Sequence, residues 1–272
     1  MARRRLLGVA GWPVGHSRSP AMHNAALEAL GIDWLYVALP LPPERFTETV
    51  PALPASGFVG VNVTVPHKHS ALAVADRASA EAAEIGAANT LTFSADDGTL
   101  AENTDAGGLL DALGDSPRGL RALVLGAGGS ARAAVWALTR AGASEVSVYN
   151  RTPKRARELA ESLGARHAEV PEDADLMVNC TTVGLDPSIS PEAAAVALGL
   201  EGLQRPPVFL DLVYGKGPTA LERWARDGGS RTVGGLEVLV HQGARSLESW
   251  THQPPPIDVM RRAAEGFQPD GA

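Results

Sequence analysis

Residues 124–131 read VLGAGGSA and join a predicted buried strand to a predicted helix through a glycine-rich turn. Gly126, Gly128 and Ala131 occupy the three small positions of the dinucleotide-binding fingerprint, in the context which that fingerprint requires. The helix N-terminus would offer backbone N–H groups to a pyrophosphate. The stretch therefore predicts a dinucleotide-binding Rossmann unit, although glycine in a strand–helix turn can also serve packing alone.

The end of the next predicted strand, residues 149–155, selects the cofactor. An NAD site needs an acidic residue here, whereas this chain has Asn150, Arg151 and Thr152, with Arg155 close by. Arginine suits a 2′-phosphate, and Thr152 would cap the next helix and offer its hydroxyl to the same phosphate. The alternative is a solvated basic helix start. Because basic residues are unfavourable at a helix N-terminus, and a bound phosphate removes that conflict, the pattern favours NADP.

Outward from this turn, strands and helices alternate along the chain, which is typical of α/β proteins with mainly parallel sheets. A boundary between two halves is expected near Asp105. The strands are expected at 5–10, 34–39, 58–65, 88–93, 99–105, 121–125, 145–150, 175–181 and 207–214. The helices are expected at 20–30, 43–50, 107–114, 129–141, 152–164, 219–229 and 237–250.

Composition narrows the class of protein. The 272 residues are 44% hydrophobic and 20% charged, as in ordinary globular proteins, and the net charge of −7 argues against nucleic acid and anionic membranes as partners. Cys180 is the single cysteine, so no disulfide can form within the chain, which fits the cytoplasm. Three arginines before an apolar stretch imitate a signal peptide, but Gly11, Pro13 and Gly15 interrupt that stretch. We expect a first buried strand there.

Residues 15–24, GHSRSPAMHN, carry more hydroxyls than helix capping requires. Ser19 is predicted as the N-cap and Pro20 as the first helical residue. This leaves His16 and Ser17 unexplained, and they point to a ligand.

The predicted strand 58–65 has two unlike faces. Val61, Val63 and Val65 would point one way, and Asn62 and Thr64 the other. An amide and a hydroxyl on one face suggest a polar cavity. Pro66 would end the strand, which would put Lys68 in the first turn of the segment that follows.

Motifs along nearly the whole chain resemble those of the shikimate dehydrogenases. They are GWPVGHSRSPAMHN, GVNVTVPHK, IGAANT, ENTDAGG, VLGAGGSARA, YNRT, VNCTTVG, DLVY and GGLEVLVHQG, in the order expected of that family. The resemblance implies an α/β fold of two domains. Residues 1–105 plus 240–272 would form a substrate domain around a mixed sheet, residues 106–239 an NADP-binding Rossmann domain, and the site would lie in the cleft between them.

The resemblance also implies the chemistry. NADPH would pass a hydride to the ketone of 3-dehydroshikimate, giving shikimate reversibly, with Lys68 and Asp105 as the catalytic pair that handles the proton. The implied substrate-binding residues are Ser17, Ser19, Asn62, Thr64, Asn89, Tyr214 and Gln242. The implied cofactor-binding residues are Gly126, Ala127, Gly128, Gly129, Ser130, Ala131, Asn150, Arg151, Thr152, Arg155, Thr181, Val213 and Gly235.

Some residues depart from the family pattern, and some alternatives stay open. His67 and His69 flank Lys68 unexpectedly, but no further ligand accompanies them and no metal is expected. Val238 stands where the family often has methionine, and Lys216 where it often has proline, and the resemblance places these two positions on the nicotinamide side and in a nearby loop. Alternative functions are a quinate/shikimate or aminoshikimate dehydrogenase, and a non-catalytic metabolite sensor. The chain could be a monomer or a homodimer.

Overall fold

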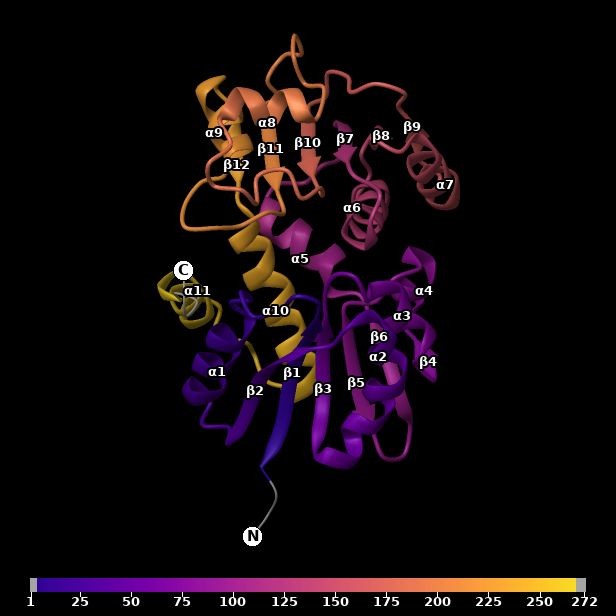
Figure 1. Cartoon of the computed structure of the whole chain (residues 1–272), viewed down its shortest axis with the longest axis vertical. Helices are drawn as coiled ribbons and strands as arrows, with labels where there is room; N and C mark the ends of the chain where they lie inside the picture. The colour runs from indigo at the N-terminus through magenta and orange to yellow at the C-terminus, as the bar shows by residue number, and fades with distance from the viewer. Residues whose placement is uncertain (1–3, 268–272) are drawn as a thin grey trace. The chain divides into compact units, whose positions relative to one another are not determined.

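The computed structural model describes residues 4–267. The chain divides into two compact units, Met1–Gly108 with Leu239–Ala272, and Leu109–Val238. Within the described residues, each unit is built on one six-stranded sheet (Figure 1). Residues 1–3 and 268–272, the two ends of the predicted substrate domain, lie outside the described range. No helix between residues 4 and 267 is long and apolar enough to cross a membrane.

The first unit contains a mixed sheet in the order β2-β1-β3-β5-β6-β4. Strand β1 is parallel to β2 and β3, whereas β5 is antiparallel to both β3 and β6. The strands are β1 Arg5–Gly11, β2 Trp34–Pro40, β3 Phe58–Val63, β4 Arg77–Ala78, β5 Thr90–Ser94 and β6 Gly98–Glu102. The helices are α1 Ser19–Ala29, α2 Pro43–Thr49, the 3₁₀ helix Val50–Ser56, α3 Lys68–Ala73, α4 Ala80–Ile85 and α11 Ile257–Gly266.

These strand directions gather the predicted site residues of the first unit at one edge of its sheet. β1, β3 and β6 all end at the edge where β5 begins, because β5 is antiparallel to its two neighbours. The residues that follow β1, β3 and β6, or precede β5, are Ser17, Ser19, Thr64, Lys68, Asn89 and Asp105.

Helices α5 (Thr104–Leu113) and α10 (Gly235–Thr251) each contain a boundary between the units. Within the first unit they approach closely at Gly108, where an added Cβ would lie 2.6 Å from the backbone nitrogen of Gln242. Only a residue without a side chain fits there, so Gly108 allows Gln242 of α10 to lie close to α5. The indole nitrogen of Trp250 donates to the carbonyl of Leu91 at 3.2 Å, which ties α10 to β5.

The second unit contains a wholly parallel sheet in the order β12-β11-β10-β7-β8-β9. Read from β9, this is the Rossmann strand order. The strands are β7 Arg121–Leu125, β8 Glu145–Tyr149, β9 Arg166–His167, β10 Leu176–Asn179, β11 Val208–Asp211 and β12 Arg231–Val233. The helices are α6 Gly129–Arg140, α7 Pro153–Leu163, α8 Pro191–Ala197 and α9 Ala220–Asp227. The predicted α/β fold, with one mixed and one Rossmann sheet, is confirmed.

Two local predictions are wrong. Ser19 is the first residue of α1 and not its N-cap, which is Arg18, and the side chain of Arg18 makes no capping bond. The cause is that the Ser17 hydroxyl accepts the backbone N–H of Ser19 at 3.3 Å, so the helix begins one residue early. Strand β3 stops at Val63, so Val65 does not share the buried face and is 65% exposed.

Candidate active site

Lys68 and Asp105 form a close ion pair within the first unit. Lys68 is the first residue of α3, and its Nζ lies 2.5 Å from Oδ2 of Asp105 in the first turn of α5. Their side chains are only 10% and 17% exposed. The carbonyl of Lys68 also accepts the N–H of Ala88 at 2.9 Å, so the backbone beneath the ammonium is held as well. This pair is too enclosed to be an ordinary surface salt bridge.

Asn89 holds the other oxygen of Asp105. The backbone N–H of Thr104 donates to Oδ1 of Asn89 at 2.7 Å, and a backbone N–H can only donate. The atom facing Thr104 is therefore the amide oxygen, and Nδ2 must face Asp105. Nδ2 donates to Oδ1 of Asp105 at 2.8 Å and lies 3.2 Å from Oε1 of Gln242. Asn89 therefore holds the side chains of Asp105 and Gln242 in place relative to the backbone of Thr104.

A buried cluster of hydroxyls and amides lies behind Asn89. Ser246 and Thr90 are completely buried, and the Ser246 Oγ accepts from Asn62 Nδ2 at 2.8 Å. The hydroxyls of Thr90 and Thr104 lie 3.0 and 3.1 Å from the same oxygen. Because every member has partners, the cluster holds β3, β5, α5 and α10 in a fixed mutual arrangement.

Asn62 belongs to this cluster more than to an open polar face. Its Nδ2 donates to Ser246, to Thr90 and to the carbonyl of Asn89. Its Oδ1 accepts the Tyr36 hydroxyl at 2.8 Å. The Asn62 amide is thus engaged within the protein, and it is 5% exposed.

His23 stacks on Tyr36 with 4.2 Å between ring centroids. Both of its ring nitrogens are buried without a hydrogen-bond partner in the described structure. Burial lowers the pKa of His23 to about 3, so the ring is neutral near pH 7.

Ser17, Ser19 and Thr64 stand at the same sheet edge as Lys68, Asp105 and Asn89. Ser17 and Ser19 are 8% and 4% exposed. Between them, Arg18 turns away and donates to the carbonyl of Ala264 in α11 at 3.0 Å. His16 is exposed.

The two histidines beside Lys68 contact backbone carbonyls. Nε2 of His67 lies 2.7 Å from the carbonyl of Leu41, and its ring stacks on Phe46. Nδ1 of His69 lies 2.9 Å from the carbonyl of Gly86. Since a carbonyl only accepts, each of these nitrogens carries a proton. Among residues 4–267, no group of three or more His, Cys, Asp or Glu side chains is placed to hold a metal ion.

In the second unit, the glycine turn has the geometry that the fingerprint predicts. Gly126 has φ 113°, and an added Cβ would lie 3.1 Å from the backbone of Cys180, so glycine is required here. An added Cβ at Gly128, the N-cap of α6, would meet no atom within 4 Å. The side chain of Ala131 is fully buried. Gly126 thus permits the turn, Gly128 leaves an open approach, and Ala131 packs the helix.

The other predicted cofactor residues follow neighbouring strands at the same edge. Every strand of this sheet is parallel, so the residues after β7, β8, β10, β11 and β12 meet at the carboxyl edge. These residues are Ala127, Gly129 and Ser130 after β7, Asn150, Arg151, Thr152 and Arg155 after β8, Thr181 after β10, Val213 after β11, and Gly235 after β12. Tyr214, a predicted substrate-binding residue, also follows β11. Arg151, Thr152 and Arg155 are exposed, and Thr152 is the N-cap of α7 without a side-chain cap bond.

The loops after β10 and β11 are joined by side chains. The Thr181 hydroxyl donates to Oδ1 of Asn179 at 2.7 Å, and Nδ2 of Asn179 donates to Asp211 at 2.8 Å. Asp211 also accepts the N–H of Val213 at 2.9 Å. Burial raises the pKa of Asp211 to about 7. Cys180, between Asn179 and Thr181, is half-buried.

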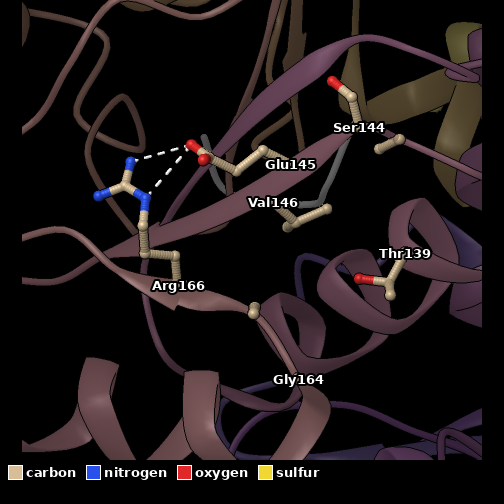
Figure 2. Close-up of a pocket in the computed structure, with 8 residues that line it drawn as sticks. Thr139, Ser144, Glu145, Val146, Gly164 and Arg166 are labelled. Carbon is tan, nitrogen blue, oxygen red and sulfur yellow. Dashed lines mark hydrogen bonds and ion pairs between the residues drawn. The ribbon is translucent and has the colours of Figure 1, made fainter.

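A hollow of about 410 Å³ lies at the opposite end of this sheet. Figure 2 shows Glu145 joined to Arg166 on one side of it, with Thr139 and Gly164 on the other. Arg166 donates to Glu145 at 3.1 Å and also pairs with Glu172. Glu145 is the first residue of β8, so the hollow is at the amino edge, whereas ligands of open parallel sheets bind at the carboxyl edge.

Sequence reasoning missed the groups that support these sites. Ser246 lies in a predicted helix and Thr90 and Thr104 lie in predicted strands, and only the fold brings their hydroxyls together. Asp211 could have been recognised from the sequence, because a carboxylate at the end of an otherwise apolar strand indicates a specific polar contact.

Comparison with known families gives matches along most of the chain. Residues 9–91 match the shikimate dehydrogenase substrate binding domain, and residues 111–183 match shikimate / quinate 5-dehydrogenase. Residues 235–265 match the shikimate 5'-dehydrogenase C-terminal domain.

Relatives match over nearly their whole length. A shikimate dehydrogenase (NADP(+)) of Methanothermobacter thermautotrophicus is 40% identical, with 96% of each chain covered. Another of Anaeromyxobacter dehalogenans is 44% identical, covering 97% of this chain and 96% of its own. The structure of shikimate 5-dehydrogenase from Thermus thermophilus in complex with NADP(H) and shikimate superposes with a TM-score of 0.84 at 40% identity, covering 96% of this chain and 98% of its own. The predicted resemblance is thus confirmed, and this chain belongs to the shikimate dehydrogenase family.

Proposed function

We propose that this protein reversibly reduces 3-dehydroshikimate to shikimate with NADPH, a step in the synthesis of chorismate and the aromatic amino acids. The observation that carries the proposal is the enclosed Lys68–Asp105 pair, 2.5 Å apart and oriented by Asn89. Family membership supplies the reaction, and this pair supplies the proton chemistry that the reaction needs. The pair also argues against a sensor, which has no need of a proton donor.

Lys68 is the proposed proton carrier. When the carbonyl of the substrate is reduced, its oxygen gains negative charge and needs a proton, which an ammonium within hydrogen-bond reach can give. Asp105 keeps the ammonium close and limits its rotation. Because Asn89 occupies Oδ1 of Asp105, Oδ2 remains directed at Nζ of Lys68. In the reverse direction, the neutral amine takes the proton from the substrate hydroxyl.

The remaining residues of the first unit are assigned to substrate binding. Ser17 and Ser19 would hold the carboxylate through neutral hydroxyls, without forming a buried ion pair. Thr64, Asn89 and Gln242 are assigned to the ring hydroxyls. Tyr214 is assigned to the neighbourhood of the carboxylate, and Asn62 to the first layer behind the ligand.

The second unit fits NADP. A helix of 12 residues begins behind the open Gly128, without an acidic residue in its first turn. Arg151, Thr152 and Arg155 bring positive charge and a hydroxyl to the start of α7, which favours a 2′-phosphate over a free hydroxyl. When bound, NADP supplies or accepts the hydride through its nicotinamide. These residues support residues 106–239 as the cofactor domain, and residues 1–105 plus 240–272 as the substrate domain.

The protein is assigned to the cytoplasm by its composition, as a monomer or homodimer acting on a small molecule. One assay tests the function: absorbance at the NADPH band, with shikimate and quinate each combined with NADP⁺ and NAD⁺. Rapid turnover only with shikimate and NADP⁺ is expected. Equal rates with quinate would establish the alternative quinate/shikimate activity, and the absence of turnover in a protein that binds shikimate would establish a sensor.

A further inference from the structure

Asp211 is a completely buried carboxylate at the end of β11 that plays no part in the proposed proton transfer. A buried carboxylate is costly unless hydrogen bonds compensate it. Asp211 accepts three such bonds. Asn179 Nδ2 and the N–H of Val213 donate to its Oδ1 at 2.8 and 2.9 Å, and the hydroxyl of Thr219 donates to its Oδ2 at 2.6 Å.

The orientation of Asn179 is forced from both sides. The backbone N–H of Thr181 donates to Oδ1 of Asn179 at 3.0 Å, and the carbonyl of Val183 accepts from its Nδ2 at 3.1 Å. A backbone N–H only donates and a carbonyl only accepts, so the amide has one possible orientation. In that orientation Nδ2 donates to Asp211.

Register brings the two side chains together. β10 and β11 are parallel, and Asn179 and Asp211 are directly paired as the last residues of these strands. After this last pair of residues, β10 and β11 continue into two separate loops. Each side chain accepts the N–H of the residue two positions further on, Thr181 in one loop and Val213 in the other. The loops are therefore tied to each other at the carboxyl edge, where a parallel sheet of this kind binds its dinucleotide.

We propose that Asn179 and Asp211 are positioning residues for the dinucleotide, which set the loops carrying Thr181 and Val213 at the spacing that binding requires. The inference rests on the proposed function, because it takes NADP as the ligand. Two apolar residues could also pack here, but they would leave the N–H groups of Thr181 and Val213 without these acceptors. The pair thus controls loop geometry without touching the ligand.

Two substitutions at Asp211 separate geometry from charge. Asp211→Asn keeps Oδ1 as the acceptor for Asn179 and Val213, and its new Nδ2 can donate to the Thr219 hydroxyl oxygen. Asp211→Leu keeps the branched shape of the side chain, adds some volume and removes every acceptor. Titration calorimetry should give a roughly 10- to 100-fold weaker affinity for NADP⁺ in Asp211→Leu, by analogy with the loss of residues that orient metal ligands. Asp211→Asn should stay within about threefold of wild type, because it keeps the acceptor geometry.

Shikimate affinity and a matched control distinguish positioning from general damage. Shikimate affinity should fall much less than NADP⁺ affinity in Asp211→Leu, because Tyr214 is the one predicted substrate residue in these two loops. Ser230→Ala also removes a buried hydrogen bond, 2.6 Å to the carbonyl of Pro206, but it does so just before β12, at the amino edge. This control should lower the melting temperature and leave NADP⁺ affinity unchanged. Should Asp211→Leu fail to fold, Asn179→Ala takes its place with the same expectations.

Hydrogen exchange without any ligand makes the test independent of the proposed function. The backbone amides of residues 180–184 and 212–215 should exchange faster in Asp211→Leu than in wild type. In Ser230→Ala their exchange rates should be unchanged. A wild type that does not bind NADP⁺ would count against the proposed function, while the exchange result would still decide whether the pair ties the loops. A folded Asp211→Leu with wild-type NADP⁺ affinity, or an Asp211→Asn as impaired as the leucine variant, would overturn the positioning role.

Discussion

Asn89→Asp tests whether Asn89 acts through Asp105 or directly on the substrate. The substitution is isosteric, and the retained oxygen still accepts the N–H of Thr104. The amide nitrogen that donated to Asp105 at 2.8 Å becomes a carboxylate oxygen. A hydrogen bond is thereby replaced by two acidic groups facing each other within a site whose Asp105 side chain is 17% exposed.

The expected effect follows from Coulomb's law. Two unit charges about 4 Å apart at an effective dielectric constant of about 20 repel by about 4 kcal/mol, or about 3 pH units of titration. The ammonium of Lys68, 2.5 Å from Asp105, attracts both carboxylates and offsets part of this repulsion. We therefore expect the acid limb of the kcat profile to move up by about 2 pH units, because the added negative charge favours the protonated forms of the carboxylate pair and of Lys68, whose neutral amine accepts the substrate proton in oxidation.

The measurement is kcat for shikimate oxidation from pH 5 to 10, in wild type, Asn89→Asp and the control Asn103→Asp. Asn103 is also a buried asparagine, but it bonds to the backbone of Ala87 and Ala106. Its substitution should cost stability and leave the acid limb in place. If Asn89→Asp instead keeps the wild-type profile and only raises KM for shikimate, Asn89 is a substrate ligand and does not orient Asp105.

Four further predictions address the remaining assignments. Lys68→Ala should lower kcat by about 10²–10⁴, the usual share of general acid–base catalysis, with shikimate affinity in calorimetry little changed; a folded variant with wild-type turnover would exclude Lys68 as proton carrier. Arg151→Ala should raise KM for NADP⁺ about tenfold, through loss of a charged hydrogen bond, and leave NAD⁺ kinetics unchanged; equal effects on both coenzymes would contradict a 2′-phosphate contact. Ser17→Ala should weaken shikimate binding in calorimetry and spare NADP⁺ binding, whereas equal losses would indicate a damaged fold. The pKa of Asp211 is raised by burial from 3.8 to about 7, so the folded state binds its proton more tightly, and this group costs stability as pH rises from about 4 to 7. Asp211→Asn removes that slope, so its unfolding free energy in urea should improve relative to wild type by up to about 4 kcal/mol between pH 4 and 8, and a constant difference would contradict this.

The sequence predicted those parts of the fold that depend on local pattern. Apolar runs, glycine turns and proline-started helices predicted the central strands of both sheets, and the fingerprint at Gly126 predicted the Rossmann half. The short strands β4, β9 and β12 were missed, because two or three residues carry too little pattern to be recognised. The N-cap of α1 could not be predicted, because it depends on which N–H group the Ser17 hydroxyl accepts.

The residues that hold the site residues in place come from segments far apart in the sequence. Their contacts could therefore not be predicted from local pattern. Asn179 and Asp211 meet only through the register of β10 with β11. Ser246 meets Asn62 across 184 positions of sequence. The individual roles of the substrate and cofactor residues stay predictions, which the variants above are designed to test.

The placement of α10 and α11 has a consequence for how the chain folds during synthesis. The second unit is one continuous segment, residues 109–238, and can fold as soon as that segment has left the ribosome. The first unit must wait, because Arg18 bonds to Ala264 and Leu91 bonds to Trp250. Until those late residues arrive, the hydroxyl cluster lacks Ser246 and Asn89 lacks Gln242. The Lys68–Asp105 site is therefore completed last, after the dinucleotide-binding half of the protein has formed.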